Sequence, residues 1–380
     1  MLSPRQGVSC EWSFFTFEPR VGNAVLTSRV FASAALEGAR TLSSNSLNRL
    51  PLVTLYLTER CNSRCVTCDY WRTGRADVTL ESVRALLPSL ERLQTRAVLI
   101  SGGEPLLNPE WPQIAHELRS RGLSLWLLTS GLSLAKHARR VAQLFDAVTV
   151  SMDGTNPETY AAIRGLDAFD KVCEGVRAVT GYGLGANLRV TLQRANYREL
   201  PLFVGLARQL GVQQVSFLAV DVANPHAFGR IDDSVPDVAL GSADLPVLAG
   251  ILDSLERTHA AEFRAGFIAE SPAKLRRILQ YFAAIHGQAS FPPVRCNAPE
   301  FSAVVDAKNR VQPCFFIPAP FDSTVRSDLS EVLDGEDMAR LRKDIREQRR
   351  PECARCVCSM WREPGSFTGA DYLAAPRVAV

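Results

Sequence analysis

The stretch Val53-Thr-Leu-Tyr-Leu57 is a short apolar run, and the triplet Cys61-Asn-Ser-Arg-Cys65-Val-Thr-Cys68 follows it closely. A short run that is almost entirely apolar is typical of a strand buried on both faces of a parallel sheet. Such a strand leads the chain to the carboxyl edge of the sheet, where α/β barrels build their active sites. The three cysteines are therefore expected at the mouth of a barrel.

Five more apolar runs repeat this pattern, at residues 97–100, 123–128, 147–150, 188–192 and 215–218. Segments with apolar residues three and four apart lie between them, for example at residues 80–93, 114–118 and 202–210. This alternation indicates repeated βαβ units, whose right-handed crossovers curl a sheet into a partial or full barrel. With six strands, we expect an α/β protein built on a partial (β/α)6 TIM-like barrel.

The composition of the 380-residue chain is that of a folded protein, with 46% hydrophobic and 22% charged residues. Its net charge of +3 is too small to indicate a nucleic acid or a membrane surface as a partner. No apolar run approaches the roughly 20 residues that a membrane span needs. Charged residues near the start, such as Arg5 and Glu11, do not fit a secretory signal. We therefore expect a cytoplasmic protein with neither nucleic-acid nor membrane partners.

The sequence pattern divides the chain into four parts. We expect an N-terminal extension at 1–50, the barrel at 51–220, a helical insertion or substrate cap at 221–295, and a small cysteine-rich Fe–S domain at 296–380. Shorter elements are predicted inside these parts: a strand at 12–17, helices at 245–263, 272–285 and 338–348, and a strand pair at 303–305 and 311 that turns at Lys308 and Asn309.

Most of the ten cysteines are clumped. One group is the triplet after the first strand, and the other is Cys353, Cys356 and Cys358, with Cys296 and Cys314 before it. Clumped cysteines in a cytosolic chain indicate metal or cluster ligands rather than disulfides. A 4Fe–4S cluster normally has four Cys ligands, so three would leave one iron open for a substrate or cofactor. The alternative for the triplet is a structural zinc knuckle, although such sites usually have four ligands.

Three motifs in order along the chain resemble the radical S-adenosylmethionine (SAM) superfamily. Cys61, Cys65 and Cys68 match its CxxxCxxC signature, Gly102-Gly-Glu-Pro105 its GGEP motif, and Ser151-Met-Asp-Gly154 its fourth-strand pattern. The resemblance implies that the cysteines hold a 4Fe–4S cluster whose open iron binds SAM. Reductive cleavage of SAM then gives a 5′-deoxyadenosyl radical, which abstracts hydrogen from a substrate.

The resemblance also implies a SAM site at the ends of the strands. Gly102 and Gly103 are expected to let the backbone approach the SAM ammonium, because glycine has no Cβ. The other candidates are Glu104 and Pro105, which fix the turn, Ser130, Ser151 and Asp153 for the ribose or methionine part, and Arg164 for the carboxylate. For Arg164 alone, a solvated position at a helix end is the simpler interpretation. Thr67 stands where many members carry an aromatic residue, and Tyr70 or Trp71 could pack the adenine instead.

The second cysteine group looks like the C-terminal twitch or SPASM extension of the same superfamily, which holds auxiliary 4Fe–4S clusters. A full SPASM extension carries seven cysteines for two clusters, and only five are present, so one auxiliary cluster is expected. Its implied ligands are Cys296, Cys314, Cys353 and Cys356. Cys358 could replace Cys356 or be a spare thiol. The alternative is a zinc ribbon with four cysteine ligands.

The function implied by the resemblance is a redox-active radical SAM enzyme that acts on a small-molecule biosynthetic intermediate. It would need a reductant such as flavodoxin or ferredoxin. About 50 residues precede the barrel, which is short for an added peptide-recognition domain. Peptide modification, as in RiPP maturation, is the second candidate. A non-catalytic zinc-binding α/β protein is the third.

Overall fold

The computed structural model describes residues 47–225, 227–230, 237–320, 324–325 and 328–362. The strand expected at residues 12–17 lies outside these ranges. No helix in the described part of the chain is long and apolar enough to cross a membrane.

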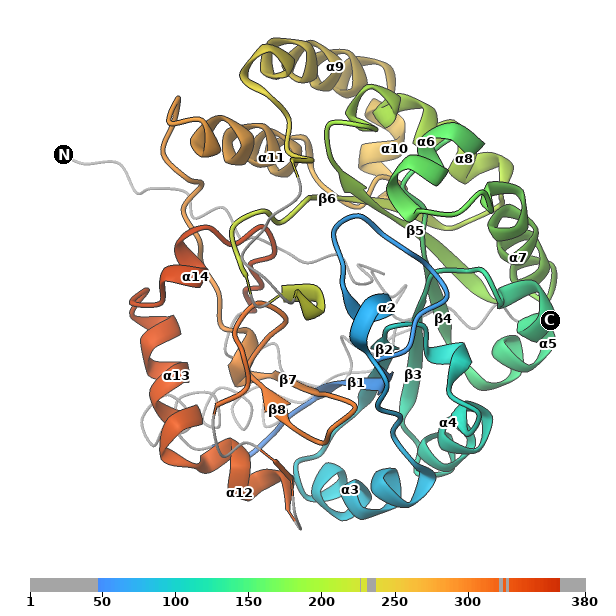
Figure 1. Ribbon diagram of the computed structural model, residues 1–380, viewed down its shortest axis with the longest axis vertical. Coiled ribbons are helices and arrows are strands. Elements are labelled where there is room, and N and C mark those ends of the chain that lie inside the picture. The colour runs from blue at the N-terminus through green and yellow to red at the C-terminus, as the bar shows by residue number, and fades with distance from the viewer. Residues whose placement is uncertain (1–46, 226, 231–236, 321–323, 326–327, 363–380) are drawn as a thin grey trace, which may run out of the picture.

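All six predicted barrel strands are present, each within a few residues of its expected position. They are β1 (Leu52–Thr58), β2 (Ala97–Gly102), β3 (Ser124–Thr129), β4 (Ala147–Ser151), β5 (Gly185–Leu192) and β6 (Gln214–Ala219). Each pairs in parallel with its successor, so the apolar runs do mark a parallel sheet. The sheet is open, because β6 forms one end of the strand order. The fold is thus the expected partial barrel (Figure 1).

Helices surround the sheet as an outer ring (Figure 1). They include α3 (Leu80–Arg92), α4 (Trp111–Ser120), α5 (Leu134–Leu144), α6 (Pro157–Arg164), α7 (Phe169–Gly181) and α8 (Leu200–Gln209). Alternate β1 residues Val53, Leu55 and Leu57 belong to the core beneath this ring. Leu52 instead joins a separate small cluster with Leu99 and Trp126, which fills the floor of the barrel. Both faces of the strands are therefore buried at this level, as the unbroken apolar runs require.

The segment after β6 contains one helix more than its apolar pattern predicts. The helix expected at 245–263 is two helices, α9 (Leu245–Thr258) and α10 (Ala260–Arg264). The break follows Thr258, whose hydroxyl donates to the Ser254 carbonyl at 2.9 Å. A side chain that bonds back to its own helix in this way favours a bend. The helix expected at 272–285 is α11 (Pro272–Ile285).

The C-terminal hairpin belongs to the barrel sheet, which the sequence did not indicate. β7 (Ser302–Val305) pairs in parallel with β1, and β8 (Val311–Gln312) pairs antiparallel with β7. The turn contains Asn309 with φ of 59°, as expected for a residue that tolerates the left-handed region. β7 covers the free edge of β1, which would otherwise present unpaired backbone groups. Helices α12 (Leu329–Asp334), α13 (Glu336–Arg346) and α14 (Pro351–Ala354) follow.

Candidate functional site

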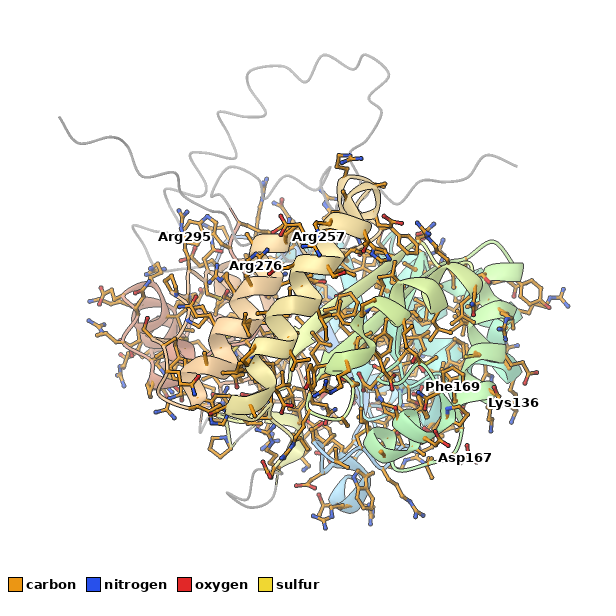
Figure 2. The ribbon with its side chains drawn as sticks, turned by 90° about the horizontal axis from the view of Figure 1, so that it is seen from above. Lys136, Asp167, Phe169, Arg257, Arg276 and Arg295 are labelled. Carbon is orange, nitrogen blue, oxygen red and sulfur yellow. The ribbon has the colours of Figure 1, made fainter. Side chains whose placement is uncertain are left out.

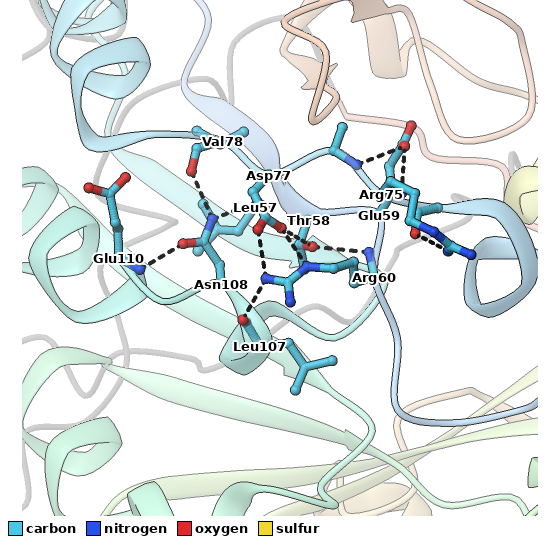
Figure 3. Close-up of polar contacts among 12 residues, drawn as sticks. Leu57, Thr58, Glu59, Arg60, Arg75, Asp77, Val78, Leu107, Asn108 and Glu110 are labelled. Carbon is cyan, nitrogen blue, oxygen red and sulfur yellow. Dashed lines mark hydrogen bonds and ion pairs between the residues drawn. The ribbon is translucent and has the colours of Figure 1, made fainter.

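The cysteine triplet lies at the carboxyl end of β1, where the chain is held in place before it reaches Cys61. The Arg60 guanidinium donates to both Asp77 carboxylate oxygens, at 3.1 and 2.6 Å, and to the Leu107 carbonyl at 2.9 Å. The Thr58 hydroxyl donates to the same carboxylate. Asn108 ties the Leu57 and Val78 carbonyls together nearby (Figure 3). The position of the triplet is therefore fixed by contacts that precede it.

The loop that carries the cysteines also rests on the end of α6. The backbone N–H groups of Arg64 and Val66 donate to the carbonyls of Arg164 and Ile163, at 2.9 and 3.0 Å. Gly165 follows with φ of 72°, and a Cβ there would lie 2.4 Å from the Arg64 carbonyl oxygen. Glycine is required at this position by both its φ and the close approach of the loop.

The two glycines of the GGEP segment make room for a neighbouring backbone. A Cβ on Gly102 would lie 2.4 Å from the Thr58 carbonyl oxygen, and one on Gly103 would lie 2.2 Å from that of Arg60. Two hydrogen bonds accompany this contact, from Gly103 N to Thr58 O at 2.7 Å and from Glu104 N to Arg60 O at 2.8 Å. The glycines thus let β2 pack against the segment that leads into Cys61. Their expected approach to the SAM ammonium stays a prediction.

Glu104 is fully buried, and its carboxylate accepts hydrogen bonds from other residues of the protein. Its carboxylate accepts from the Thr129 hydroxyl at 2.8 Å and from the backbone and hydroxyl of Ser130 at 2.7 and 2.6 Å. Burial raises the pKa of Glu104, and the Ser130 and Thr129 bonds oppose that shift. Pro105 begins a short 3-10 turn after Glu104. The backbone N–H of Leu106 in this turn also donates to the Glu104 carboxylate. Glu104 therefore joins the end of β2 to the end of β3.

The predicted solvated position of Arg164 is wrong. Its guanidinium is buried, with Nε 2.7 Å from Asp153 Oδ2 and Nη1 3.5 Å from Cys65 Sγ. The other Asp153 oxygen accepts from the Thr191 N–H at 2.7 Å. Burial raises the pKa of Asp153, and the charge of Arg164 opposes the rise. Protein groups thus contact both carboxylate oxygens, and the pair connects β4, β5 and the cysteine loop. Ser151 precedes it at the end of β4.

The three thiols are half-buried and close to donors of the same loop. The Ser63 N–H lies 3.4 Å from Cys61 Sγ, and the Ser63 hydroxyl lies 3.3 Å from Cys65 Sγ. Burial raises the pKa of Cys61 to about 11 and that of Cys68 to about 12. Metal coordination deprotonates such thiols, so an iron–sulfur cluster would displace protons as it binds.

Tyr56, which the sequence analysis did not single out, lies between the two cysteine groups. Its ring is 6.2 Å from that of Tyr70, just after Cys68, and stacks 6.5 Å from that of Phe315, just after Cys314. Burial raises the pKa of Tyr56, and Cys68 and Cys314 both add to the rise. Strand alternation could have indicated this position. Residues two apart in a strand share a face, so Tyr56 and Thr54 both lie on the barrel-facing side of β1. Tyr70 thus packs edge-on against Tyr56, and its expected contact with the adenine stays a prediction.

A short segment after β6 crosses the mouth of the barrel between the same two groups (Figure 1). This is η3 (Ala227–Gly229), in which Phe228 has φ of 59°. The Phe228 carbonyl accepts from the Asp69 N–H at 3.0 Å, and its ring lies 5.9 Å from that of Phe316. A bulky residue in the left-handed region is unusual, and such positions gather at functional sites.

The second cysteine group converges on one pocket. The sequence-predicted ligands all line it: Cys296, Cys314, Cys353, Cys356 and Cys358. Burial raises the pKa of Cys314 and of Cys353 to about 12. Cys358 lies on the pocket with the others, so the structure leaves both Cys356 and Cys358 as candidate ligands.

The donors of both groups fit iron–sulfur clusters. All are sulfurs, and several receive backbone N–H groups, such as Cys356 Sγ from Cys358 N at 3.2 Å and Cys296 Sγ from Met360 N at 3.5 Å. In proteins, hydrogen bonds to the sulfurs and apolar surroundings tune the reduction potential of such clusters. Within the described ranges, no three His, Cys, Asp or Glu side chains converge on a single-ion site.

Two family models match the chain. The model described as radical SAM superfamily matches residues 55–204, and the SPASM model, an iron–sulfur cluster-binding domain, matches residues 296–357. The first therefore contains the triplet and the ends of β2 to β5. The second contains the pocket of five cysteines apart from Cys358.

Similar proteins cover most of the chain. Pre-heme d1 synthase of Dinoroseobacter shibae is 29% identical over 80% of this chain and 78% of its own length. Fe-coproporphyrin III synthase of Methanosarcina barkeri is 24% identical over 82% of each. Among solved structures, Streptococcus suis SuiB bound to precursor peptide SuiA has a TM-score of 0.60 at 12% identity, over 87% of this chain and 74% of that one. At that identity, the likeness to SuiB shows the fold alone.

Proposed function

Since the chain belongs to the radical SAM superfamily and carries an iron–sulfur cluster-binding SPASM domain, we propose that it transforms a small-molecule biosynthetic intermediate. A radical SAM domain uses a 4Fe–4S cluster and SAM, and together these supply a 5′-deoxyadenosyl radical that abstracts hydrogen from the substrate. The observation that carries the proposal is the position of Cys61, Cys65 and Cys68 at the carboxyl end of β1. Active sites of α/β barrels are built at this edge.

The chain's own residues would hold and shield this site. We assign the three thiolates to the SAM-binding cluster, and Gly102, Gly103, Pro105, Ser130 and Ser151 to contacts with SAM. Glu104 would position Ser130 through the bonds described above. Asp153 and Arg164 would position Cys65 and its loop from the barrel side. The segment around Phe228 would exclude water from the space between the two cysteine groups, which protects a reactive radical from side reactions.

The auxiliary site is assigned to one 4Fe–4S cluster. Its ligands would be Cys296, Cys314, Cys353 and either Cys356 or Cys358. The cluster would accept the second electron in a net oxidation or position the substrate. Radical SAM enzymes in general need a reductant, and we propose a flavodoxin or ferredoxin for this one.

A small molecule is favoured over a peptide because of the two relatives that match about four fifths of this chain. Their names are those of synthases of heme-related compounds. A match over about four fifths of this chain extends beyond the barrel, into parts that would help to enclose a substrate. We therefore place the substrate in the class of small metabolites.

Metal analysis of anaerobically purified protein tests the cofactor assignment. Two 4Fe–4S clusters correspond to about eight iron and eight sulfide per chain. Stoichiometric zinc without sulfide would contradict the proposal and favour a zinc-stabilised protein. The substrate class is tested with deuterated candidates, whose label should appear in 5′-deoxyadenosine. Transfer from peptides but from no small metabolite would favour a peptide maturase instead.

A further inference from the structure

A buried carboxylate sits on the outer edge of β6, just after the short parallel bridge between Val215 and Ile268. Glu270 lies between α10 and α11 and is 2% exposed. One oxygen accepts from the Phe217 N–H at 2.6 Å, and the other accepts from the Ser216 hydroxyl at 3.2 Å. Both partners belong to β6, the strand at the open end of the sheet. Glu270 thus satisfies a backbone donor that would otherwise need another strand.

Two cations surround this carboxylate. Lys274 Nζ lies 3.7 Å from Glu270 Oε1, one helical turn along the chain. Arg189 comes from β5, where it is the register partner of Ser216. Its neighbours Leu188 and Val190 belong to the core beneath the helices, so alternation directs Arg189 into the barrel. Burial lowers the pKa of Arg189, and the charge of Glu270 opposes this.

The same cations face the auxiliary cysteines. Lys274 and Cys356 line one pocket, together with residues 217–219 at the end of β6. The charges of Arg189 and Lys274 both lie within electrostatic range of Cys358. Two positive charges and one negative charge therefore lie beside thiols that would carry negative charge in a cluster.

We propose that Arg189, Lys274 and Glu270 set the reduction potential of the auxiliary cluster, an inference that rests on the proposed function. Reduction adds one electron to a cluster and makes it more negative, so nearby cations favour the reduced form and a carboxylate disfavours it. The net charge around a cluster is one of the factors that set its potential. Arg189 and Lys274 would raise the potential, and Glu270 would limit the rise. A raised potential makes the cluster a better acceptor for the electron that a substrate radical must lose in a net oxidation.

The test is a redox titration of the full-length, cluster-loaded protein, followed by EPR. Cys61, Cys65 and Cys68 are replaced by Ala, so that the auxiliary cluster gives the remaining signal, and dithionite supplies the electrons. Lys274→Met is expected to shift the midpoint to a more negative potential. Glu270→Gln, which keeps the shape of the side chain, is expected to shift it to a more positive one. Lys274→Arg should keep the midpoint potential of the parent, because it keeps the positive charge.

Arg276→Met is the matched control. It removes a unit charge from the same helix, but Arg276 lies at the α9 side, where it pairs with Asp253 and Glu256 (Figure 2). Its midpoint should stay at that of the parent. Equal midpoints in Lys274→Met, Glu270→Gln and the parent overturn this inference and leave the proposed function intact. A parent that loads no auxiliary cluster overturns both. Lys274 is partly exposed, so its variant should fold even if Glu270→Gln does not.

Discussion

Arg164 at the end of α6 forms a buried ion pair with Asp153 after β4, with Arg164 Nε 2.7 Å from Asp153 Oδ2. Arg164 also reaches Cys65 Sγ, and its backbone carbonyl accepts from Arg64. One residue therefore links the segment at residues 151–154 to the cysteine triplet. This contact brings together two motifs that are more than eighty residues apart in sequence.

Replacement of Arg164 by Met should be strongly destabilising, because it leaves the Asp153 carboxylate buried and unpaired. Breaking one side of a buried pair typically costs about 3–5 kcal/mol. Urea unfolding of the cluster-free protein measures this. Asp153→Asn combined with Arg164→Met should recover part of the loss, since the unpaired charge is gone. An unchanged urea midpoint in the single variant would show that the pair does not stabilise the fold.

Gly103→Ala should prevent β2 from packing on the segment before Cys61. The added Cβ would lie 2.2 Å from the Arg60 carbonyl oxygen, which is backbone and cannot turn away. Overpacking of this kind costs about 1–3 kcal/mol and sometimes more, and iron content at the triplet should fall with it. Gly250→Ala in α9 is the control, because a Cβ there meets nothing within 4 Å. That change should stabilise the protein by about 0.5–1 kcal/mol.

Cluster loading at the triplet should become more favourable as pH rises. Burial raises the pKa of Cys61 to about 11 and of Cys68 to about 12, so both thiols are protonated in the empty site at neutral pH. Each must lose its proton to bind iron. The apparent affinity should rise between about pH 7 and pH 9, by up to about tenfold per unit for each thiol. Reconstitution against a fixed iron chelator at several pH values measures it. Loading that is independent of pH would contradict the pKa shifts.

The hairpin that leads to Cys314 depends on the left-handed backbone of Asn309. With φ of 59° there, Asn309→Ala should cost about 1–2 kcal/mol. Asn309→Gly should be tolerated, because glycine adopts this conformation freely. Urea midpoints of the two variants give the comparison. If Ala and Gly were equally stable at this position, the turn would not need a left-handed residue.

The strands of the barrel could be predicted because each is a local apolar run between helical patterns, and both signals lie within a few residues. The hairpin turn at Asn309 was equally local. By contrast, the pairing of β7 with β1 joins segments far apart in the chain, and nothing near Ser302 indicates it. The break after Thr258 coincides with a side-chain hydrogen bond to Ser254, which apolar periodicity does not register.

At the site, too, local sequence signals could be read and contacts between distant segments could not. Cysteine spacing was enough to group the thiols, because ligands of one cluster recur at short intervals. The burial of Arg164 was missed, because an arginine at a helix end is usually solvated and its partner Asp153 comes from another element. Glu270 was missed as well, since its role depends on the open edge of β6. The position of Tyr56 could not be predicted from the apolar run at residues 53–57, because its neighbours Tyr70 and Phe315 come from other segments.

The most direct test of the account is the formation of 5′-deoxyadenosine from SAM under dithionite, in the absence of oxygen. The wild-type protein should form it, and so should Cys314→Ala, which alters only the auxiliary site. Cys65→Ala should form none while it keeps the auxiliary cluster. Undiminished 5′-deoxyadenosine from Cys65→Ala, or none from the fully loaded wild type, would contradict the assignment of the triplet as the SAM-cleaving centre.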